Sequence, residues 1–254
     1  MKLDFTKAKA GVVVAGHRGD PACFPENTMS SFRSAYKKGV DMIETDIHVT
    51  KDGALVLMHD HSALRTAGVD RLIRDMTFEE VRALNVGTET VPEKVPTLEE
   101  LLAFAAPKAP LTLDLEIKVY LEDEGAARVA YAVDETVKLC EKYGMTDRVM
   151  FNCFDAYVLE YLRDTYGGAF TLHGYYPYSH MKNVNKDPKD ILDIACYWKK
   201  HSDPKESTDF LKRIGVLSCT GNTTEEEFRE AVALGVSMVT VNDPAEAIAR
   251  REKL

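Results

Sequence analysis

Short segments of strand composition, separated by segments of helical composition, constrain the fold of this chain most strongly. Eight strand segments are predicted, at residues 12–15, 40–50, 54–58, 111–119, 148–155, 169–175, 214–219 and 236–241. A regular alternation of strands and helices predicts a parallel sheet. The chain has 254 residues, of which 45% are hydrophobic, and this is the usual size of one closed barrel. We therefore predict a single-domain (β/α)8 TIM barrel over residues 1–254, with a doubly wound open sheet as the alternative.

Capping residues mark several helix boundaries between these strands. Thr28 precedes a helical apolar face made by Phe32, Ala35 and Tyr36, and Gly39 is expected to end that helix. Capping boxes predict three further helix starts, at Thr77–Glu80, Thr97–Glu100 and Thr224–Glu227. One long helix is expected over residues 122–143 and a hairpin-type turn over 51–53, and residues 176–210 are the least periodic part of the chain.

Composition limits the classes of partner and the compartment. The net charge is −9 and no Lys/Arg run is present, so we expect no nucleic-acid partner. Five scattered cysteines without a CxxC motif are typical of reduced thiols in a cytoplasmic protein. The polar residues 1–10 show no signal peptide, and no run of 18 apolar residues occurs, so no stable membrane association is expected. The oligomeric state stays open.

The segment 40–50 carries two carboxylates that a strand seldom places together. Glu44 and Asp46 are two residues apart, so both point to the same face. Adjacent carboxylates repel each other and lose hydration when buried, unless a cation lies between them. Together with Glu116, at the end of the segment 111–119, they predict a site of hard oxygen ligands for Mg²⁺ or Ca²⁺. The alternative is a set of unrelated surface acids on amphipathic strands.

Two histidines fall where a barrel places its chemistry. His17 follows the strand segment 12–15 and His59 follows 54–58, and the C-terminal ends of barrel strands carry catalytic residues. Because imidazole titrates near neutral pH, we predict that His17 and His59 form a general acid/base pair beside the metal. The alternative for each is a buried histidine with satisfied hydrogen bonds.

Cationic side chains accompany the acids. Arg18 follows His17, and Lys118 lies two residues after Glu116. We predict that Arg18 and Lys118 bind phosphate oxygens, with charge balance for the acids as a compatible alternative. His173, near the end of a strand, is a further candidate for the substrate pocket. No HExxH motif or Cys/His cluster is visible, which argues against zinc.

The order and spacing of these motifs resemble the glycerophosphodiester phosphodiesterase family. The motifs are His17-Arg18-Gly19, Pro25-Glu26-Asn27-Thr28, Glu44-Thr45-Asp46, Asp52-Gly53, His59-Asp60, Glu116-Ile117-Lys118 and Asp243-Pro244. The resemblance implies a (β/α)8 barrel that hydrolyses small glycerophosphodiesters to sn-glycerol 3-phosphate and an alcohol. It also implies a divalent ion, Mg²⁺ or Ca²⁺, on the three carboxylates, acid/base roles for both histidines, and phosphate contacts from Arg18 and Lys118.

Two features depart from the family pattern. A Trp-Thr-x-Asn run, whose Trp forms an aromatic wall, is replaced by Cys219-Thr220-Gly221-Asn222. The aromatic residues of 176–210 follow no family pattern, and they either cover the mouth of the barrel or pack on its side. Two other functions stay open. One is a phospholipase D-like enzyme acting on a lysophospholipid or another phosphodiester, and the other is a barrel that binds phosphodiesters without cleaving them.

Overall fold

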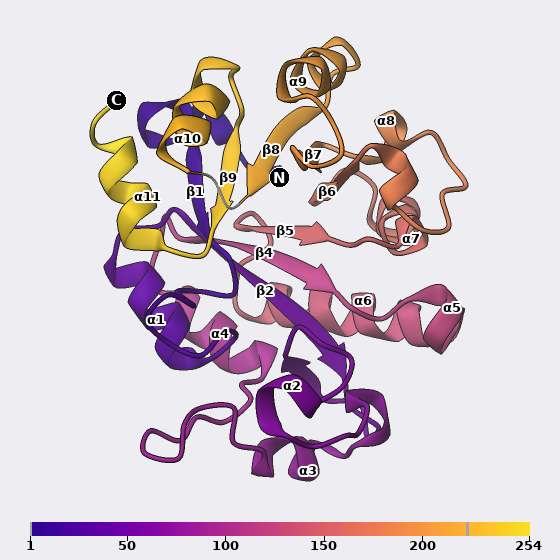
Figure 1. Ribbon diagram of the computed structural model, residues 1–254. Coiled ribbons are helices and arrows are strands. Elements are labelled where there is room, and N and C mark those ends of the chain that lie inside the picture. The colour runs from indigo at the N-terminus through magenta and orange to yellow at the C-terminus, as the bar shows by residue number, and fades with distance from the viewer. Residues whose placement is uncertain (1, 222–223) are drawn as a thin grey trace.

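The computed structural model describes residues 2–221 and 224–254 and shows a closed parallel barrel (Figure 1). Nine strands in the described residues form one sheet in the order β1-β9-β8-β7-β6-β5-β4-β2-β3, and β1 also pairs with β2, which closes the ring. The strands are β1 (Val13–Gly16), β2 (Met42–Val49), β3 (Leu55–Leu57), β4 (Thr112–Ile117), β5 (Val149–Asn152), β6 (Thr171–Tyr176), β7 (Ile194–Tyr197), β8 (Leu217–Gly221) and β9 (Met238–Val241). The predicted (β/α)8 fold is confirmed.

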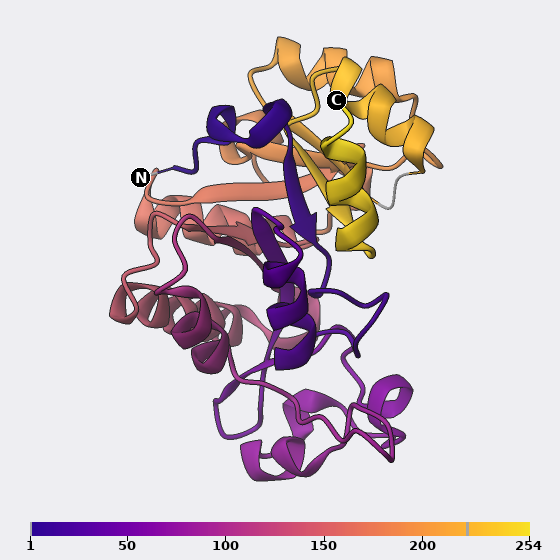
Figure 2. The same cartoon turned by 90° about the vertical axis from the view of Figure 1, so that its left-hand side faces the viewer.

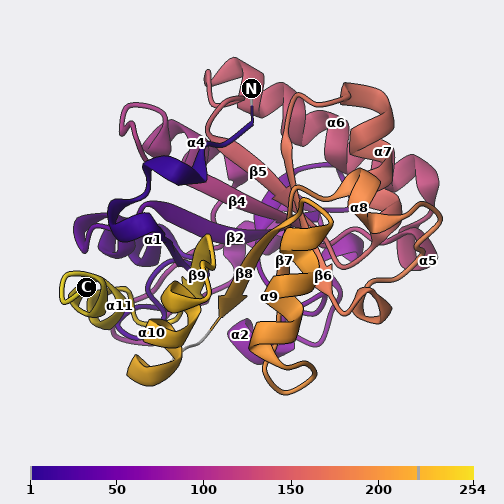
Figure 3. The same cartoon turned by 90° about the horizontal axis from the view of Figure 1, so that it is seen from above.

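Helices surround the strands (Figure 3). They are α1 (Met29–Lys37), α2 (Leu64–Ala67), α3 (Phe78–Ala83), α4 (Leu98–Ala105), α5 (Leu121–Glu124), α6 (Ala126–Lys142), α7 (Ala156–Tyr166), α8 (Pro188–Ile191), α9 (Pro204–Arg213), α10 (Glu225–Ala233) and α11 (Pro244–Arg251). Short 3-10 turns occur at Phe5–Lys7, Lys9–Gly11, Ile73–Asp75 and Tyr178–His180. Across the described residues, no helix has the length and apolar character needed to cross a membrane. The cytoplasmic location stays a prediction.

The identity of one barrel strand differs from the prediction. The segment 54–58 was expected to be a barrel strand, but β3 runs antiparallel to β2, with Ile47 opposite Leu57. The physical reason is the short turn between them, because a parallel crossover needs a dozen or more residues. The missing barrel strand is β7, which lies inside the segment 176–210 and pairs in parallel with β6 and β8.

Several element boundaries also differ. The helix expected over 122–143 is two helices, α5 and α6, because Gly125 adopts a φ of +79° between them. The strand expected at 214–219 begins at Leu217, since α9 reaches Arg213. On α1, Phe32 and Ala35 are buried as predicted, but Tyr36 is exposed. The three predicted capping boxes are confirmed. The helix expected after Pro25–Thr28 begins at Met29, and Thr28 is its N-cap.

Two hydrophobic clusters hold the molecule together. The larger one fills the space between the barrel strands and the surrounding helices, where side chains such as Phe32 and Ile43 are fully buried. The smaller one, around Val56, Ile73 and Val81, holds a lobe that projects from the barrel at the end of β2 (Figures 1 and 2). Because His59 follows β3 in this lobe, the lobe brings His59 to the mouth of the barrel.

The loop after β1 is packed too closely for side chains at two of its positions. A Cβ on Gly16 would lie 2.5 Å from the carbonyl oxygen of Gly19. A Cβ on Gly19, whose φ is +90°, would lie 2.4 Å from Ser31 Oγ. Glycine at both positions therefore lets the loop carry His17 and Arg18 back over the end of β1.

We expect Gly19→Ala to destabilise the protein more than Gly39→Ala. The two glycines have φ values of +90° and +87°, but a Cβ on Gly39 would meet nothing within 4 Å. Both variants should lose about 1–2 kcal/mol from left-handed backbone strain. Gly19→Ala should lose a further ~1–3 kcal/mol because of the overlap with Ser31. Chemical denaturation measures both free energies of unfolding, and equal losses would contradict the tight packing of this loop.

Candidate active site

A cavity of about 270 Å³ opens at the C-terminal end of the barrel. Most of the predicted site residues line it, namely His17, Arg18, Glu44, His59, Glu116, Lys118 and His173. Asp46 is completely buried behind them, where it contacts Arg18 and Lys118. The structure therefore brings together all eight predicted site residues, although they come from distant parts of the chain.

Three buried carboxylates face one another across β2 and β4. Glu44, Asp46 and Glu116 place one oxygen each within 4.8 Å of the others. Burial, together with the neighbouring negative charges, raises the pKa of Glu44 well above its usual value. Glu44 Oε2 also accepts a hydrogen bond of 2.8 Å from the backbone N–H of Arg18, which fixes its orientation. The cluster is thus a concentrated negative site that a cation would stabilise.

Two cations already balance part of this charge. Lys118 Nζ lies 3.1 Å from Asp46 Oδ1 and also donates to Glu116, and Arg18 Nε lies 3.5 Å from Asp46 Oδ2. Burial alone would raise the pKa of Asp46, but the charge of Lys118, helped by His59 and Arg18, lowers it. The charge-balance role considered for Arg18 and Lys118 therefore operates in this structure.

The donor set fits a hard divalent ion. All three clustered side chains offer oxygen, which Mg²⁺ and Ca²⁺ prefer. Asp46 Oδ1 is buried and has no partner except the Lys118 ammonium 3.1 Å away, so one of its lone pairs remains for an ion. Glu44, Asp46 and Glu116 are therefore suited to hold such an ion, as expected from the sequence.

Each candidate catalytic histidine is oriented through the same ring nitrogen. His17 Nδ1 donates to Asn242 Oδ1 over 2.7 Å, and His59 Nδ1 donates to Asp60 Oδ1 over 2.6 Å. Nε2 is then the nitrogen left for proton transfer, and in His17 it lies 4.0 Å from Glu44 Oε2. Burial and the charge of Arg18 lower the pKa of His17, and burial and Lys118 lower that of His59.

A chain of ion pairs connects the two sides of the site. Arg65 donates to Asp60 over 2.6 Å and to both oxygens of Glu26 over 2.6 and 3.0 Å. Glu26 in turn accepts from Arg18 over 3.0 Å. Sequence reasoning missed Arg65 and Asn242, because nothing in their local sequence indicates these partners. Glu26 lies in a motif quoted above, but no role was assigned to it.

Aromatic rings form the opposite wall of the cavity. Phe154 stacks on Tyr175 with ring centroids 3.6 Å apart, and Trp198 lies 5.6 Å from Phe154. Trp198, from the segment 176–210, lines the cavity and supplies an aromatic side that Cys219 does not. In the same segment Tyr176 packs instead on Phe210 at 5.1 Å, so both expectations for these aromatics hold in part. Asn222 lies outside the described residues.

His173 lies deep in the barrel with both ring nitrogens engaged. Nδ1 donates to Asp114 Oδ2 over 2.9 Å, and Nε2 lies 3.2 Å from Cys219 Sγ. Although burial opposes it, the negative charge of Asp114 raises the pKa of His173 to about 10. A hydrogen bond from Cys219, aided by His173, lowers the pKa of the Cys196 thiol to about 6. The substrate-binding role of His173 stays a prediction.

His48 supports the site from outside the cavity. Its side chain is buried, Nε2 donates to the carbonyl oxygen of His59 over 3.3 Å, and its ring packs against His61. Burial and the neighbouring His61 lower the pKa of His48 to about 3. His48 is therefore neutral in the folded protein at any pH near neutrality.

We expect His48→Gln to weaken the acid sensitivity of the fold. An unfolded histidine has a pKa near ~6.5, whereas folded His48 has a pKa of about 3. Between these pH values the unfolded state binds the extra proton, so stability falls as the pH falls. In the native protein, this proton uptake lowers the free energy of unfolding by about 2 kcal/mol between pH 7 and pH 5. Urea unfolding at both pH values measures this change, and the loss of unfolding free energy should be smaller by that amount in His48→Gln. His201→Gln is the control, because His201 is exposed, and it should lose as much as the native protein. If the loss shrinks equally in both variants, the assignment to His48 is refuted.

Comparison with known proteins points to one family. Residues 17–245 match the model of the Glycerophosphoryl diester phosphodiesterase family. Glycerophosphodiester phosphodiesterase 1 of Rattus norvegicus is 28% identical, and the match covers 94% of this chain and 80% of that protein. A glycerophosphodiester phosphodiesterase of Caldanaerobacter subterraneus subsp. tengcongensis is 33% identical over 151 residues, which are 58% of this chain and 60% of that protein.

A solved structure shares the fold. A phosphodiesterase of Oleispira antarctica, in complex with the product sn-glycerol-3-phosphate, superposes with a TM-score of 0.81 at 19% identity, over 94% of this chain and 96% of that one. The family match spans most of the barrel, from the loop after β1 to the start of α11. Because that match covers most of the chain, the chain belongs to the glycerophosphoryl diester phosphodiesterase family.

Proposed function

We propose that this protein hydrolyses glycerophosphodiesters to sn-glycerol 3-phosphate and an alcohol. The observation that carries the proposal is a single cavity that holds two oriented histidines beside three clustered carboxylates. Family membership supports it, as does the product bound to the Oleispira antarctica phosphodiesterase. We also propose that residues 1–254 act as one catalytic domain, since strands from both ends of the chain, β1 and β9, pair with each other.

The phosphate group would be held by charge. A divalent ion on Glu44, Asp46 and Glu116, Mg²⁺ or Ca²⁺, would neutralise negative charge on the phosphodiester. Arg18 lines the cavity, and its Nε makes no hydrogen bond and only the 3.5 Å ion pair with Asp46, so we propose that its guanidinium also contacts a phosphate oxygen. Lys118 Nζ, from the same wall, would add a second positive charge.

The two histidines would divide the proton transfers. One of His17 and His59 removes the proton from the nucleophile, which we propose is the glycerol 2-hydroxyl, and the phosphorus–oxygen bond to the alcohol breaks as a cyclic phosphate forms. The other histidine gives its proton to the departing alcohol. Water then opens the cyclic phosphate while the histidines exchange roles. The Nδ1 bonds to Asn242 and Asp60 hold each ring in the orientation that these transfers require.

Replacing either histidine should abolish most of the turnover. We expect His17→Ala and His59→Ala to lower kcat by about 10²–10⁴-fold, because each removes a proton-transfer group. The assay measures glycerol 3-phosphate released from glycerophosphocholine, glycerophosphoethanolamine and glycerophosphoglycerol with Mg²⁺ or Ca²⁺. His201→Gln is the control and should keep its activity.

Other results would select an alternative. Substrate retention without any product would favour the non-catalytic binding barrel. Turnover confined to lysophospholipids would favour the phospholipase D-like enzyme. Full activity in either alanine variant would remove that histidine from the mechanism.

Removing the metal ion and removing one carboxylate charge should have the same effect on turnover. EDTA should abolish turnover, and Glu44→Gln should lose both ion binding and turnover, while keeping an acceptor for the Arg18 N–H. Glu160→Gln is the control, because Glu160 is also buried and accepts backbone N–H bonds, at 2.9 Å, but lies outside the cavity. Calorimetric titration with Mg²⁺ and Ca²⁺ measures the binding. Unchanged ion affinity in Glu44→Gln would contradict the assignment.

A further inference from the structure

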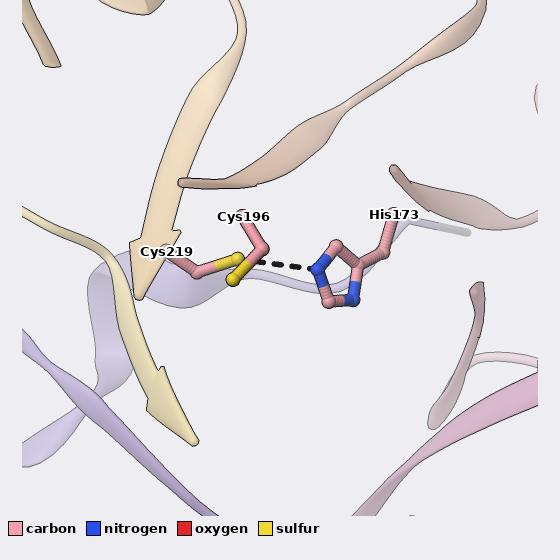
Figure 4. A group of neighbouring side chains, drawn as sticks. All are labelled: His173, Cys196 and Cys219. Atoms are coloured by element: carbon pink, nitrogen blue, oxygen red, sulfur yellow. Dashed lines mark hydrogen bonds between the residues drawn. The ribbon is translucent and has the colours of Figure 1, made fainter. Parts of the chain in front are cut away.

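A second cluster of metal-binding side chains lies inside the barrel, on different strands from the carboxylates. His173 comes from β6, Cys196 from β7 and Cys219 from β8, which are adjacent strands. Cys196 and Cys219 are register partners. Figure 4 shows their two sulfur atoms side by side, with the imidazole of His173 directing one nitrogen toward them. The sequence argument against any Cys/His cluster is therefore wrong, because strand pairing unites residues far apart in the chain.

The spacing of the three donor atoms suits a tetrahedral ion. His173 Nε2 and the two sulfur atoms all lie within 4.8 Å of one another, and Nε2 is 3.2 Å from Cys219 Sγ. Around tetrahedral zinc, with bonds of about 2.3 Å to sulfur and 2.0–2.1 Å to nitrogen, neighbouring donors lie ~3.6–3.8 Å apart. Small side-chain rotations would therefore bring all three atoms to bonding distance of one ion.

Asp114 supplies an independent indication of a ligand. Its Oδ2 accepts the Nδ1–H of His173 over 2.9 Å, so Nε2 is the nitrogen that faces the sulfur atoms. Metal-bound histidines commonly donate their other N–H to a carboxylate in this way. Asp114 is completely buried, and its Oδ1 has no hydrogen-bond partner. This hydrogen bond would hold the imidazole in the orientation that points Nε2 at an ion bound by the two sulfur atoms.

We propose that His173, Cys196 and Cys219 form a second metal site, which binds Zn²⁺ through one imidazole nitrogen and two thiolates. Sulfur and nitrogen donors favour a soft or borderline ion, whereas the carboxylate cluster favours a hard one. Binding displaces the protons that His173 Nε2 and the cysteine sulfur atoms carry, and these protons pass to solvent. His173 and Cys196 line the cavity, so the fourth zinc position is open to a water molecule from that side. The proposal is independent of the proposed hydrolysis.

Cobalt provides a direct probe of thiolate ligands. The full chain, freed of metal with a chelator under a phosphine reductant, is titrated with Co²⁺ alone. We expect a thiolate-to-cobalt absorption band in the near ultraviolet and tetrahedral cobalt bands in the visible, which saturate at one equivalent and disappear when Zn²⁺ is added. No such bands in the reduced native protein would overturn the proposal.

Variants assign the bands to this site. Cys196→Ser and Cys219→Ser should each lose the band, and Cys140→Ala, which replaces another fully buried thiol on α6, should keep it. Glu44→Gln should also keep the band, because it alters only the carboxylate cluster. Asp114→Asn should weaken Zn²⁺ affinity by about 10–100-fold while preserving the band. A band that survives both serine substitutions, or that is lost in Cys140→Ala, would contradict the assignment.

A second measurement uses the unmodified protein and does not depend on how a variant folds. X-ray absorption at the zinc edge, with one equivalent of Zn²⁺, should show two sulfur neighbours at about 2.3 Å and nitrogen at about 2.0–2.1 Å. A shell of oxygen neighbours alone would place the ion on the carboxylates and overturn the proposal. A Cys196–Cys219 disulfide that persists under the reductant, found by mass spectrometry of unreduced peptides, would also overturn it.

Discussion

The burial of several carboxylates inside one barrel is the constraint on which the rest of this structure depends. Glu44 and Asp46 on β2 stand in register with Asp114 and Glu116 on β4, and all four are buried. Negative charges at this spacing would destabilise the fold if nothing compensated them. Neighbouring groups compensate this negative charge. Lys118 pairs with Asp46 and Glu116, and the loop after β1 brings in further positive groups.

The loop after β1 shows how local backbone geometry serves this electrostatic requirement. Arg18 has a φ of +55°, and its backbone N–H reaches Glu44 while its side chain lies between Glu26 and Asp46. A residue in that conformation is strained, and the close approach of Gly16 and Gly19 holds it there. The same loop presents His17 to the cavity. Charge compensation and the placement of a candidate proton carrier therefore depend on one short segment.

Sequence analysis succeeded where the signal is local. Period-two spacing put Glu44 and Asp46 on one face, and capping boxes located three helix starts, because each depends on residues within a few positions of one another. It failed for β7, a strand of four buried residues in an aperiodic segment, and for β3, where a short turn was noticed but its antiparallel consequence was not drawn.

The supporting residues of the site could not be predicted for a related reason. Asn242 reaches His17 across the closure of the barrel, and Arg65 reaches Glu26 from the lobe beyond β2. Both contacts arise from tertiary packing between segments far apart in the chain. The local sequence around a single asparagine or arginine does not indicate such a distant partner. The histidines and carboxylates, in contrast, are noticeable because strands seldom carry them.

The interior of the barrel is chemically divided between its two sides. Strands β2 and β4 direct oxygen donors inward, while β6, β7 and β8 direct nitrogen and sulfur inward, and Asp114 lies between the two sets, paired in register with Glu44 and hydrogen-bonded to His173. Asp114 is also among the charges that raise the pKa of Glu44, so the residue that orients His173 adds to the negative charge around the carboxylate cluster. Hard and soft donors therefore stand on separate strands, and one buried carboxylate is in contact with both halves of the barrel.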